Sequence, residues 1–315
     1  MEKKIERIAV IGAGIMGPGI AQVFAGHGYN VSLNDVDESK LGNGIERVKQ
    51  NLALFIKKGL ATEEQSKLIF SNIIVTSDPT KAVKDADFII EAITESIDAK
   101  KKLFEQIEII CPPHAILASN TSTIRISDMA AATRRPEKFI GTHWMLPPHI
   151  RPLVEIIPGE KTSKQTIDTT MDLIASLGKV PVQAKDMPGF IINRLQAGIF
   201  IQALALLEEG ISKEAIDRAW THHLGLRYCL MGPVEGMDSM GLDTVYLAGL
   251  YLSAVFNDPS WAPTETLKRK FESGEYGYKT GKGFYDYTGR DINQIISNRD
   301  EELINLMRAR NIQIG

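Results

Sequence analysis

The first strand-like run of the chain, Ile8-Ala9-Val10-Ile11, leads directly into Gly12-Ala13-Gly14-Ile15-Met16-Gly17. An apolar strand followed by GxGxxG at the start of a helix is typical of a dinucleotide-binding loop, in which the pyrophosphate lies on the helix N-terminus. In the alternative interpretation, the glycines serve only tight turns. The context favours cofactor binding by Gly12, Gly14, Ile15, Met16 and Gly17.

An acidic residue, Asp35, ends the next strand-like segment, 18 residues beyond Gly17. At about this offset an acidic side chain hydrogen-bonds the ribose hydroxyls of NAD and repels the 2′-phosphate of NADP. We therefore predict NAD as the cofactor. The alternative is that Asp35 caps the following helix.

The composition is ordinary for a globular protein of about two domains, with 315 residues, 43% of them hydrophobic and 24% charged. A net charge of -3 without a basic stripe predicts no nucleic-acid partner. The two cysteines lack CxxC spacing, so neither a disulfide framework nor a metal site is expected. No apolar run approaches the roughly 20 residues of a membrane helix. We expect a cytoplasmic protein without membrane association.

Short apolar runs alternate with helical stretches through the first part of the chain. The predicted strands are Ile8–Ile11, Val31–Leu33, Ile73–Val75, Phe88–Ile90, Ile116–Ala118, Phe139–Gly141 and Leu153–Ile157. This alternation predicts an α/β fold with a doubly wound, parallel sheet, here a Rossmann-type domain over residues 1–185. Helical periodicity then replaces strands, so residues 186–315 are predicted to form an all-α domain for substrate binding and dimerisation. Its long apolar faces favour a homodimer.

A long insertion near residues 38–70 separates the second and third predicted strands. Residues 38–58 form a charged amphipathic pattern that ends at Gly59, and Thr62-Glu63-Glu64-Gln65 offers a capping box for a second helix. The pair is either a projecting arm or two helices packed on the domain.

Polar residues with catalytic potential follow two later strands. Ser122 lies in the loop after the Ile116 strand, and His143 lies at the end of the Phe139 strand. In a doubly wound fold these strand ends face one ligand crevice. Glu155 lies in an apolar run where a carboxylate needs a partner, and His143 is a suitable one. A neutral His143 would accept the proton of a substrate hydroxyl while Glu155 stabilises the imidazolium.

Ser122 and Asn193 are candidates to hydrogen-bond the oxygen that alternates between hydroxyl and carbonyl. Each residue of this set also has a structural explanation when taken alone. His143 would be a buried core histidine, Ser122 part of a turn, and Asn193 an exposed residue on a helix.

Six segments together resemble the 3-hydroxyacyl-CoA dehydrogenase family. They are the Gly12 loop, Glu91–Glu95, Ser119–Ser122, Gly141–His143 with Glu155, Pro188–Arg194 and Lys279–Tyr285. The resemblance spans nearly the whole chain and implies a Rossmann domain followed by a helical domain that usually dimerises. It implies a His143–Glu155 dyad, with Ser122 and Asn193 placing the substrate. It also implies NAD contacts from Asp35, Glu95, Lys100, Ser122 and Lys279.

The reaction implied by the resemblance interconverts an L-3-hydroxyacyl-CoA, of short chain as in 3-hydroxybutyryl-CoA, and the 3-ketoacyl-CoA. Two departures from the family pattern leave open whether the substrate is a CoA thioester. Leu146 stands where the family typically has an Asn near the cofactor, and Val48 aligns roughly with a Ser that meets coenzyme A in some members. Lys57 and Lys58 are candidates to bind coenzyme A instead, and the alternative is an ordinary solvated pair of lysines.

The segments Pro147–Pro152 and Leu224–Pro233 look more like relatives that oxidise free hydroxy acids or small alcohols related to gulonate, carnitine or pyridine carboxylates. In that alternative, Arg151 or Arg227 would hold a substrate carboxylate. The rival interpretation, slightly favoured for both, is a surface arginine that covers apolar neighbours. A third, less favoured possibility is an NADH-binding protein without turnover. The presence of Ser122, His143, Glu155 and Asn193 together argues against it.

Overall fold

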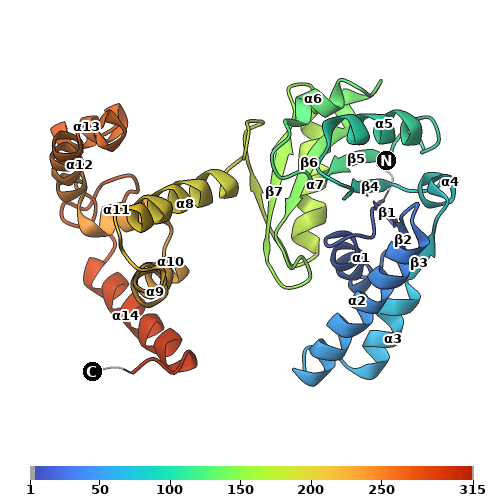
Figure 1. Ribbon diagram of the computed structural model, residues 1–315, viewed down its shortest axis with the longest axis horizontal. Coiled ribbons are helices and arrows are strands. Elements are labelled where there is room, and N and C mark those ends of the chain that lie inside the picture. The colour runs from blue at the N-terminus through green and yellow to red at the C-terminus, as the bar shows by residue number, and fades with distance from the viewer. Residues whose placement is uncertain (1–3, 314–315) are drawn as a thin grey trace. The chain divides into compact units, whose positions relative to one another are not determined.

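The computed structural model describes residues 4–313, and its contacts divide the chain into two compact units, Met1–Ile199 and Phe200–Gly315 (Figure 1). The first unit contains an eight-stranded sheet in the order β3-β2-β1-β4-β5-β6-β7-β8. The strands are β1 (Arg7–Ile11), β2 (Asn30–Asn34), β3 (Ile73–Thr76), β4 (Phe88–Glu91), β5 (Ile116–Ser119), β6 (Phe139–Trp144), β7 (Leu153–Pro158) and β8 (Val180–Gln183). The predicted α/β fold and all seven predicted strands are confirmed.

Two features of the sheet were not predicted. β7 runs antiparallel to β6, whereas the other neighbouring strands are parallel. β8 pairs with β7 at the sheet edge, where its residues are half-buried or exposed and Pro181 interrupts the apolar pattern. An edge strand tolerates proline because one side of its backbone has no ladder partner.

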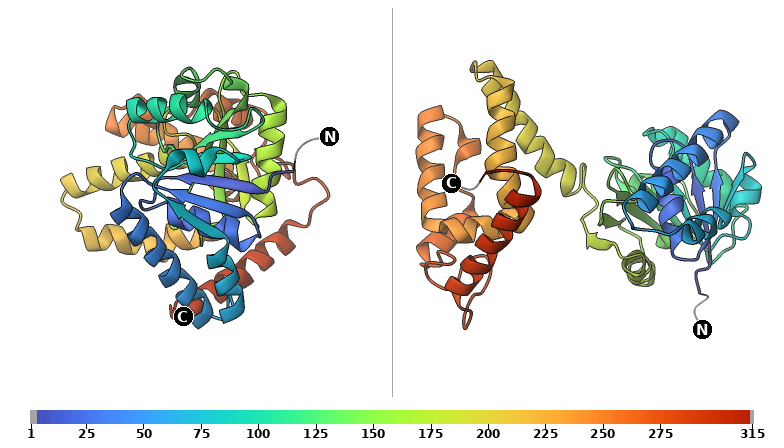
Figure 2. Two further views of the ribbon diagram at one scale, coloured as in Figure 1. Left: turned by 90° about the vertical axis from the view of Figure 1, so that its right-hand side faces the viewer. Right: turned by 90° about the horizontal axis from the view of Figure 1, so that it is seen from below.

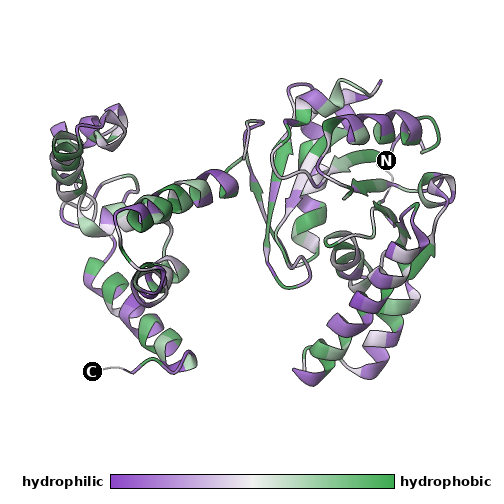
Figure 3. Cartoon of the chain, in the orientation of Figure 1, coloured by the Kyte–Doolittle hydropathy of each residue, from purple (hydrophilic) through white to green (hydrophobic). Residues whose placement is uncertain are grey.

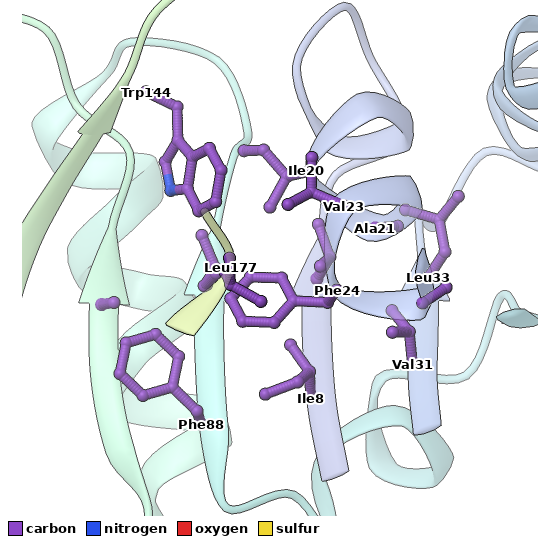
Figure 4. Packing of buried hydrophobic residues seen from close by; sticks show 14 of the residues in the cluster. Ile8, Ile20, Ala21, Val23, Phe24, Val31, Leu33, Phe88, Trp144 and Leu177 are labelled. Atoms are coloured by element: carbon purple, nitrogen blue, oxygen red, sulfur yellow. The ribbon is translucent and has the colours of Figure 1, made fainter. Parts of the chain in front are cut away.

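Helices cover both faces of the sheet because strand side chains alternate between the faces. Ile8 and Val10 belong to one buried cluster, with α1 (Gly17–Gly26) and α7 (Lys164–Ser176). Ala9 and Ile11 belong to the other cluster. The helices on that second side are α4 (Pro79–Val83), α5 (Ile97–Glu108) and α6 (Ile126–Ala130), and the short 3₁₀ turn η1 (Pro136–Lys138) precedes β6. Figure 4 shows Phe24 of α1 among core side chains of the first cluster.

The insertion after β2 forms two helices, α2 (Glu38–Lys57) and α3 (Glu63–Ser71). The predicted capping box is confirmed: the Gln65 N–H donates to Thr62 Oγ1, and the Thr62 N–H donates to Gln65 Oε1. The two helices lie side by side and both pack against α1 (Figures 1 and 2). The pair thus packs on the domain along part of its length, and its far end extends beyond α1 (Figure 1). A Cβ at Gly44 would lie 3.0 Å from Pro18, which shows how closely α2 approaches α1.

The second unit is helical, as predicted. Its elements, with the start of α8 in the first unit, are α8 (Ile192–Glu208), α9 (Lys213–Ala219), the π-helical turn η2 (Trp220–Leu224), α10 (Gly225–Leu230), α11 (Pro233–Met240), α12 (Leu242–Phe256), the 3₁₀ turn η3 (Pro259–Trp261), α13 (Glu265–Glu272) and α14 (Ile292–Ala309). Among the described residues, no single helix is both long and apolar enough to cross a membrane. Only α11 and α12 together meet that test, and they are bent by 98° relative to each other.

A buried carboxylate, Asp238 of α11, organises the loop that contains the Lys279–Tyr285 motif. Its oxygens accept hydrogen bonds from the backbone N–H groups of Phe284 and Tyr285 and from the Tyr287 hydroxyl, at 2.9 to 3.0 Å. A Cβ at Gly283 would lie 2.2 Å from Asp238 Oδ1. The motif therefore has a structural requirement for glycine in addition to any role at a ligand.

Candidate active site

Strand register brings the candidate segments to one edge of the sheet. Ile11 at the end of β1 pairs with Glu91 at the end of β4, and Glu91 pairs with Ser119 at the end of β5. The glycine loop, the Ala92–Glu95 segment and the Asn120–Thr123 loop therefore begin side by side. This is the edge at which parallel α/β sheets bind ligands.

Two glycines of the first loop are required by close packing. Gly12 has a φ of +111°, and a Cβ there would lie 2.5 Å from the Ala92 carbonyl oxygen. A Cβ at Gly17 would lie 1.8 Å from the Gly12 oxygen. At Gly14, in contrast, a Cβ would meet no atom within 4 Å, so the space beside this residue is open to a ligand. The loop therefore combines tight backbone packing at Gly12 and Gly17 with open space at Gly14.

Asp35 supports the glycine loop directly. Its Oδ2 accepts the Ala13 N–H at 2.9 Å, and its Oδ1 accepts the Asp37 N–H at 3.0 Å. The helix-capping role considered for Asp35 belongs to Asp37, whose side chain accepts from Ser39 at the start of α2. Arg47 of α2 also contacts the loop, through Nη1 to the Gly14 oxygen at 2.8 Å. The sequence offered no signal for Arg47, because an arginine on an amphipathic helix is ordinary.

The antiparallel pairing of β6 and β7 places His143 directly opposite Glu155. His143 Nδ1 lies 2.7 Å from Glu155 Oε2, and the two side chains are 8% and 1% exposed. Because an ionised carboxylate only accepts, the proton of a neutral imidazole is on Nδ1 and Nε2 is the basic nitrogen. Among the described residues, Nε2 has no hydrogen-bond partner.

The second oxygen of Glu155 is held by the backbone. Oε1 accepts the N–H groups of Ile191 at 2.8 Å and Ile192 at 3.1 Å. These groups reach it after a sharp turn with positive φ at Gly189 and Phe190. Burial raises the pKa of Glu155, but the hydrogen bonds from His143 and the two N–H groups outweigh it, so the pKa lies below its ordinary value. Glu155 is therefore ionised at neutral pH.

Ser122, Asn193 and Glu95 also lie together. Asn193 Nδ2 donates to the Ser122 carbonyl oxygen at 2.7 Å, and Glu95 Oε1 accepts the Ser122 N–H at 2.8 Å. Within the described part of the chain, the Ser122 hydroxyl has no hydrogen-bond partner, so it is available to a ligand. Asn120 connects this loop to the His143 strand, because its Oδ1 accepts the Trp144 N–H at 2.9 Å. Sequence reasoning gave Asn120 no role.

Lys100 is completely buried beside Glu95. Its Nζ lies 2.6 Å from Glu91 Oε1 and 3.3 Å from Glu95 Oε2. Burial raises the pKa of Glu91 above its ordinary value. The charge of Lys100 and the hydrogen bonds from Lys100, Ser119 and the Ile93 N–H act in the opposite direction but do not outweigh burial. The structure thus connects Lys100 to the Ser122 loop through Glu95.

Three further predicted residues of the first unit, Lys57, Lys58 and Arg151, make no hydrogen bond or ion pair with His143 or Glu155. Lys57 is near the end of α2, Lys58 caps that helix, and Arg151 is exposed after β6. Two others lie in the second unit: Lys279 Nζ binds the Asp243 carboxylate at 2.8 Å, and Arg227 Nη1 lies 3.4 Å from Met240 Sδ. The described residues contain no group of three or more His, Cys, Asp or Glu side chains able to hold a metal ion.

Comparison with known proteins shows matches over nearly the whole chain. Residues 7–187 match the 3-hydroxyacyl-CoA dehydrogenase NAD binding domain, and residues 189–287 match the C-terminal domain of the same family. The chain belongs to the 3-hydroxyacyl-CoA dehydrogenase family.

Three relatives illustrate the range of the match. A probable 3-hydroxybutyryl-CoA dehydrogenase of Bacillus subtilis is 39% identical over 285 residues, which are 90% of this chain and 98% of the relative. The crystal structure of a 3-hydroxyacyl-CoA dehydrogenase from Archaeoglobus fulgidus superposes with a TM-score of 0.82 at 35% identity, covering 98% and 100% of the two chains. That of 5-formyl-3-hydroxy-2-methylpyridine 4-carboxylic acid 5-dehydrogenase has a TM-score of 0.72 at 31% identity, covering 97% and 98%.

Membership of the 3-hydroxyacyl-CoA dehydrogenase family makes the chain an NAD-dependent oxidoreductase. The geometry of the first unit fits this cofactor. The open space at Gly14 and the N-terminus of α1 suit a pyrophosphate, and Asp35 supplies a carboxylate at the end of β2.

Proposed function

We propose that this protein interconverts a short-chain L-3-hydroxyacyl-CoA and the corresponding 3-ketoacyl-CoA, with NAD bound at the glycine loop. The observation that carries the proposal is the buried His143–Glu155 pair on the sheet that bears the glycine loop. Support also comes from the Bacillus subtilis relative, which is named a probable 3-hydroxybutyryl-CoA dehydrogenase.

The proposed chemistry divides the work between the cofactor and the side chains. Bound NAD would supply the nicotinamide that accepts the hydride. His143 Nε2 accepts the proton of the substrate hydroxyl, and the ionised Glu155 stabilises the resulting imidazolium. The Ser122 hydroxyl and the Asn193 side chain hold the substrate oxygen as it becomes a carbonyl. In the reverse direction the imidazolium returns the proton. Glu95, Lys100 and Lys279 are proposed to assist cofactor binding, as the family resemblance implies.

A groove between α2 and α3 supports a CoA thioester as substrate. It has a volume of about 570 Å³, and its lining combines three lysines and one acid, Glu63, with two serines and apolar side chains such as Phe70. The lysines are Lys49, Lys57 and Lys67, so positive charge exceeds negative charge in the groove. Ammonium groups bind phosphates as point charges, and the apolar wall suits the rest of a coenzyme A. Lys57 thus has a defined place in the proposed site, and Lys58 follows it at the end of the helix.

The test is NADH oxidation at one pH with acetoacetyl-CoA compared with free acetoacetate. We expect turnover of the thioester and little of the free acid. Replacing Lys49 and Lys57 together by alanine should raise KM for the thioester roughly 5- to 30-fold, if each contact contributes about 0.5 to 1 kcal/mol, without changing kcat. Lys161→Ala, an exposed lysine outside the groove, is the matched control. Turnover of free acids alone would reject the thioester.

A free hydroxy acid remains the second candidate substrate. It is favoured by Arg227, whose guanidinium has no carboxylate partner among the described residues, and by the relative named for a pyridine carboxylic acid. Arg151 is the other candidate for a carboxylate. Tight NADH binding without turnover of either class would instead favour the non-catalytic alternative.

We further propose that residues 1–185 bind the cofactor and that residues 186–315 form a domain for substrate binding and dimerisation. Much of α8 and α12 has the colour of hydrophobic residues in Figure 3. The large hydrophobic side chains that are exposed on α12 and on the part of α8 in the second unit include Phe200, Ile201, Leu204, Leu247, Leu250, Tyr251, Val255 and Phe256. An apolar surface of this kind is typical of a subunit interface.

Light scattering should give twice the 34.8 kDa mass of one chain. Tyr251→Lys, in the exposed face of α12, should shift the protein toward the monomer, because an interface that buries the new charge loses free energy. Ile109→Lys, at an exposed apolar position after α5, should leave the mass unchanged. A monomeric wild-type protein would contradict the dimer.

A further inference from the structure

Glu91 is a fully buried residue at the end of β4, and both oxygens of its carboxylate accept hydrogen bonds. Oε1 accepts Lys100 Nζ at 2.6 Å and the Ile93 N–H at 2.7 Å, and Oε2 accepts the Ser119 hydroxyl at 2.5 Å. All three partners are donors, which only an ionised carboxylate satisfies fully. Glu91 therefore compensates the buried charge of Lys100.

The pair is continuous with the substrate-oxygen loop. Lys100 Nζ also reaches Glu95 Oε2 at 3.3 Å, while Glu95 Oε1 accepts the Ser122 N–H at 2.8 Å. Thr121 Oγ1 donates to the same Glu95 oxygen at 2.5 Å. The Ser122 carbonyl in turn accepts Asn193 Nδ2. A continuous series of hydrogen bonds, with the Lys100–Glu95 ion pair as one link, thus extends from Glu91 to Ser122 and Asn193.

We propose that Glu91 is a positioning residue for the reaction: through Lys100 it fixes the Glu95 carboxylate and, with it, the Ser122 loop. The inference rests on the proposed roles of Ser122 and Asn193. If Glu91 is neutral, the buried ammonium of Lys100 keeps one anionic partner, Glu95, and draws that carboxylate away from the Ser122 N–H. A displacement near 1 Å at a group that holds the reacting atom is enough for about a 10²-fold loss of rate.

The test compares Glu91→Gln with Asp87→Asn. Asp87 directly precedes β4 and is also buried, with its carboxylate accepting the Glu6 and Arg7 N–H groups and His114 Nε2. The two substitutions thus neutralise buried carboxylates at opposite ends of one strand. Both should lower Tm. Glu91→Gln alone should lower kcat about 10- to 100-fold and raise the Kd of NADH several-fold, with Asp87→Asn keeping both constants near the wild type.

Ser119→Ala provides a milder variant should Glu91→Gln fail to fold, because it removes one of the three donors to Glu91. It should lower kcat in the same direction by a smaller factor. Wild-type kcat and NADH affinity in these variants, or an equal loss of kcat in Asp87→Asn, would overturn the positioning role. The NADH titration needs no substrate, so it tests Glu91 even if the wild type turns over no thioester and the proposed function fails.

Discussion

Replacing His143 by alanine is expected to lower kcat by roughly 10²- to 10⁴-fold, the range typical of losing a general acid or base. The reason is geometric. Glu155 Oε2 lies 2.7 Å from Nδ1 of the buried His143 imidazole, which leaves Nε2 as its basic nitrogen. The Kd of NADH should stay within about twofold, because His143 is proposed to act on the substrate hydroxyl. Steady-state kinetics and NADH fluorescence titration measure the two quantities.

His114→Ala is the matched control for this experiment. His114 also contacts a carboxylate, with Nε2 2.8 Å from Asp87 Oδ1, but at the opposite end of β4 from Glu91. The His114→Ala substitution should lower Tm and leave kcat near the wild-type value. Equal losses of kcat in both variants would assign the effect of His143 to folding rather than proton transfer.

Glu155→Gln is expected to lower kcat by a similar factor although it keeps the shape of the side chain. In the wild type, Oε1 accepts two backbone N–H groups and Oε2 faces His143 Nδ1. The single amide oxygen of glutamine is needed by Ile191 and Ile192, so the amide NH₂ faces Nδ1. His143 Nδ1 must then accept, and the proton moves to Nε2, which loses its basicity. NADH affinity should change little, whereas a kcat within threefold of the wild type would contradict this arrangement.

The same substitution has a defined effect on acid stability. The pKa of Glu155 in the folded protein lies below its ordinary value of 4.5. Its ionised form therefore contributes stability above that pH, and the contribution is lost as the pH falls through the folded pKa. The unfolding free energy of Glu155→Gln should fall less steeply with acidification than that of the wild type, as measured by urea unfolding across the acidic range.

The sequence predicted the fold well because the signals for it are local. The apolar run before Gly12 and the Thr62–Gln65 capping box depend on neighbouring residues alone, and both elements are present. β8 was missed because an exposed, proline-containing edge strand has no apolar alternation. The direction of β7 was missed because a strand of buried residues looks the same in either direction.

Parts of the candidate site depend on contacts that spacing does not reveal. The sequence predicted the pairing of His143 with Glu155, because a carboxylate in an apolar run needs a partner. The backbone donors to the second oxygen of Glu155 come from residues 191 and 192, which are 36 and 37 positions away in the sequence. Lys100 was expected to meet the cofactor, and the structure adds that its ammonium is buried between Glu91 and Glu95. No periodicity predicts that a lysine on an amphipathic helix is fully buried.

The protonation of His143 tests the central claim most directly. The protein has six histidines, so ¹⁵N spectra of histidine-labelled protein can be assigned by comparison with His143→Ala. At a pH where the ring is neutral, we predict a proton on Nδ1 and a bare Nε2 in the wild type, and the opposite tautomer in Glu155→Gln. A wild-type proton on Nε2 would contradict a base oriented by Glu155.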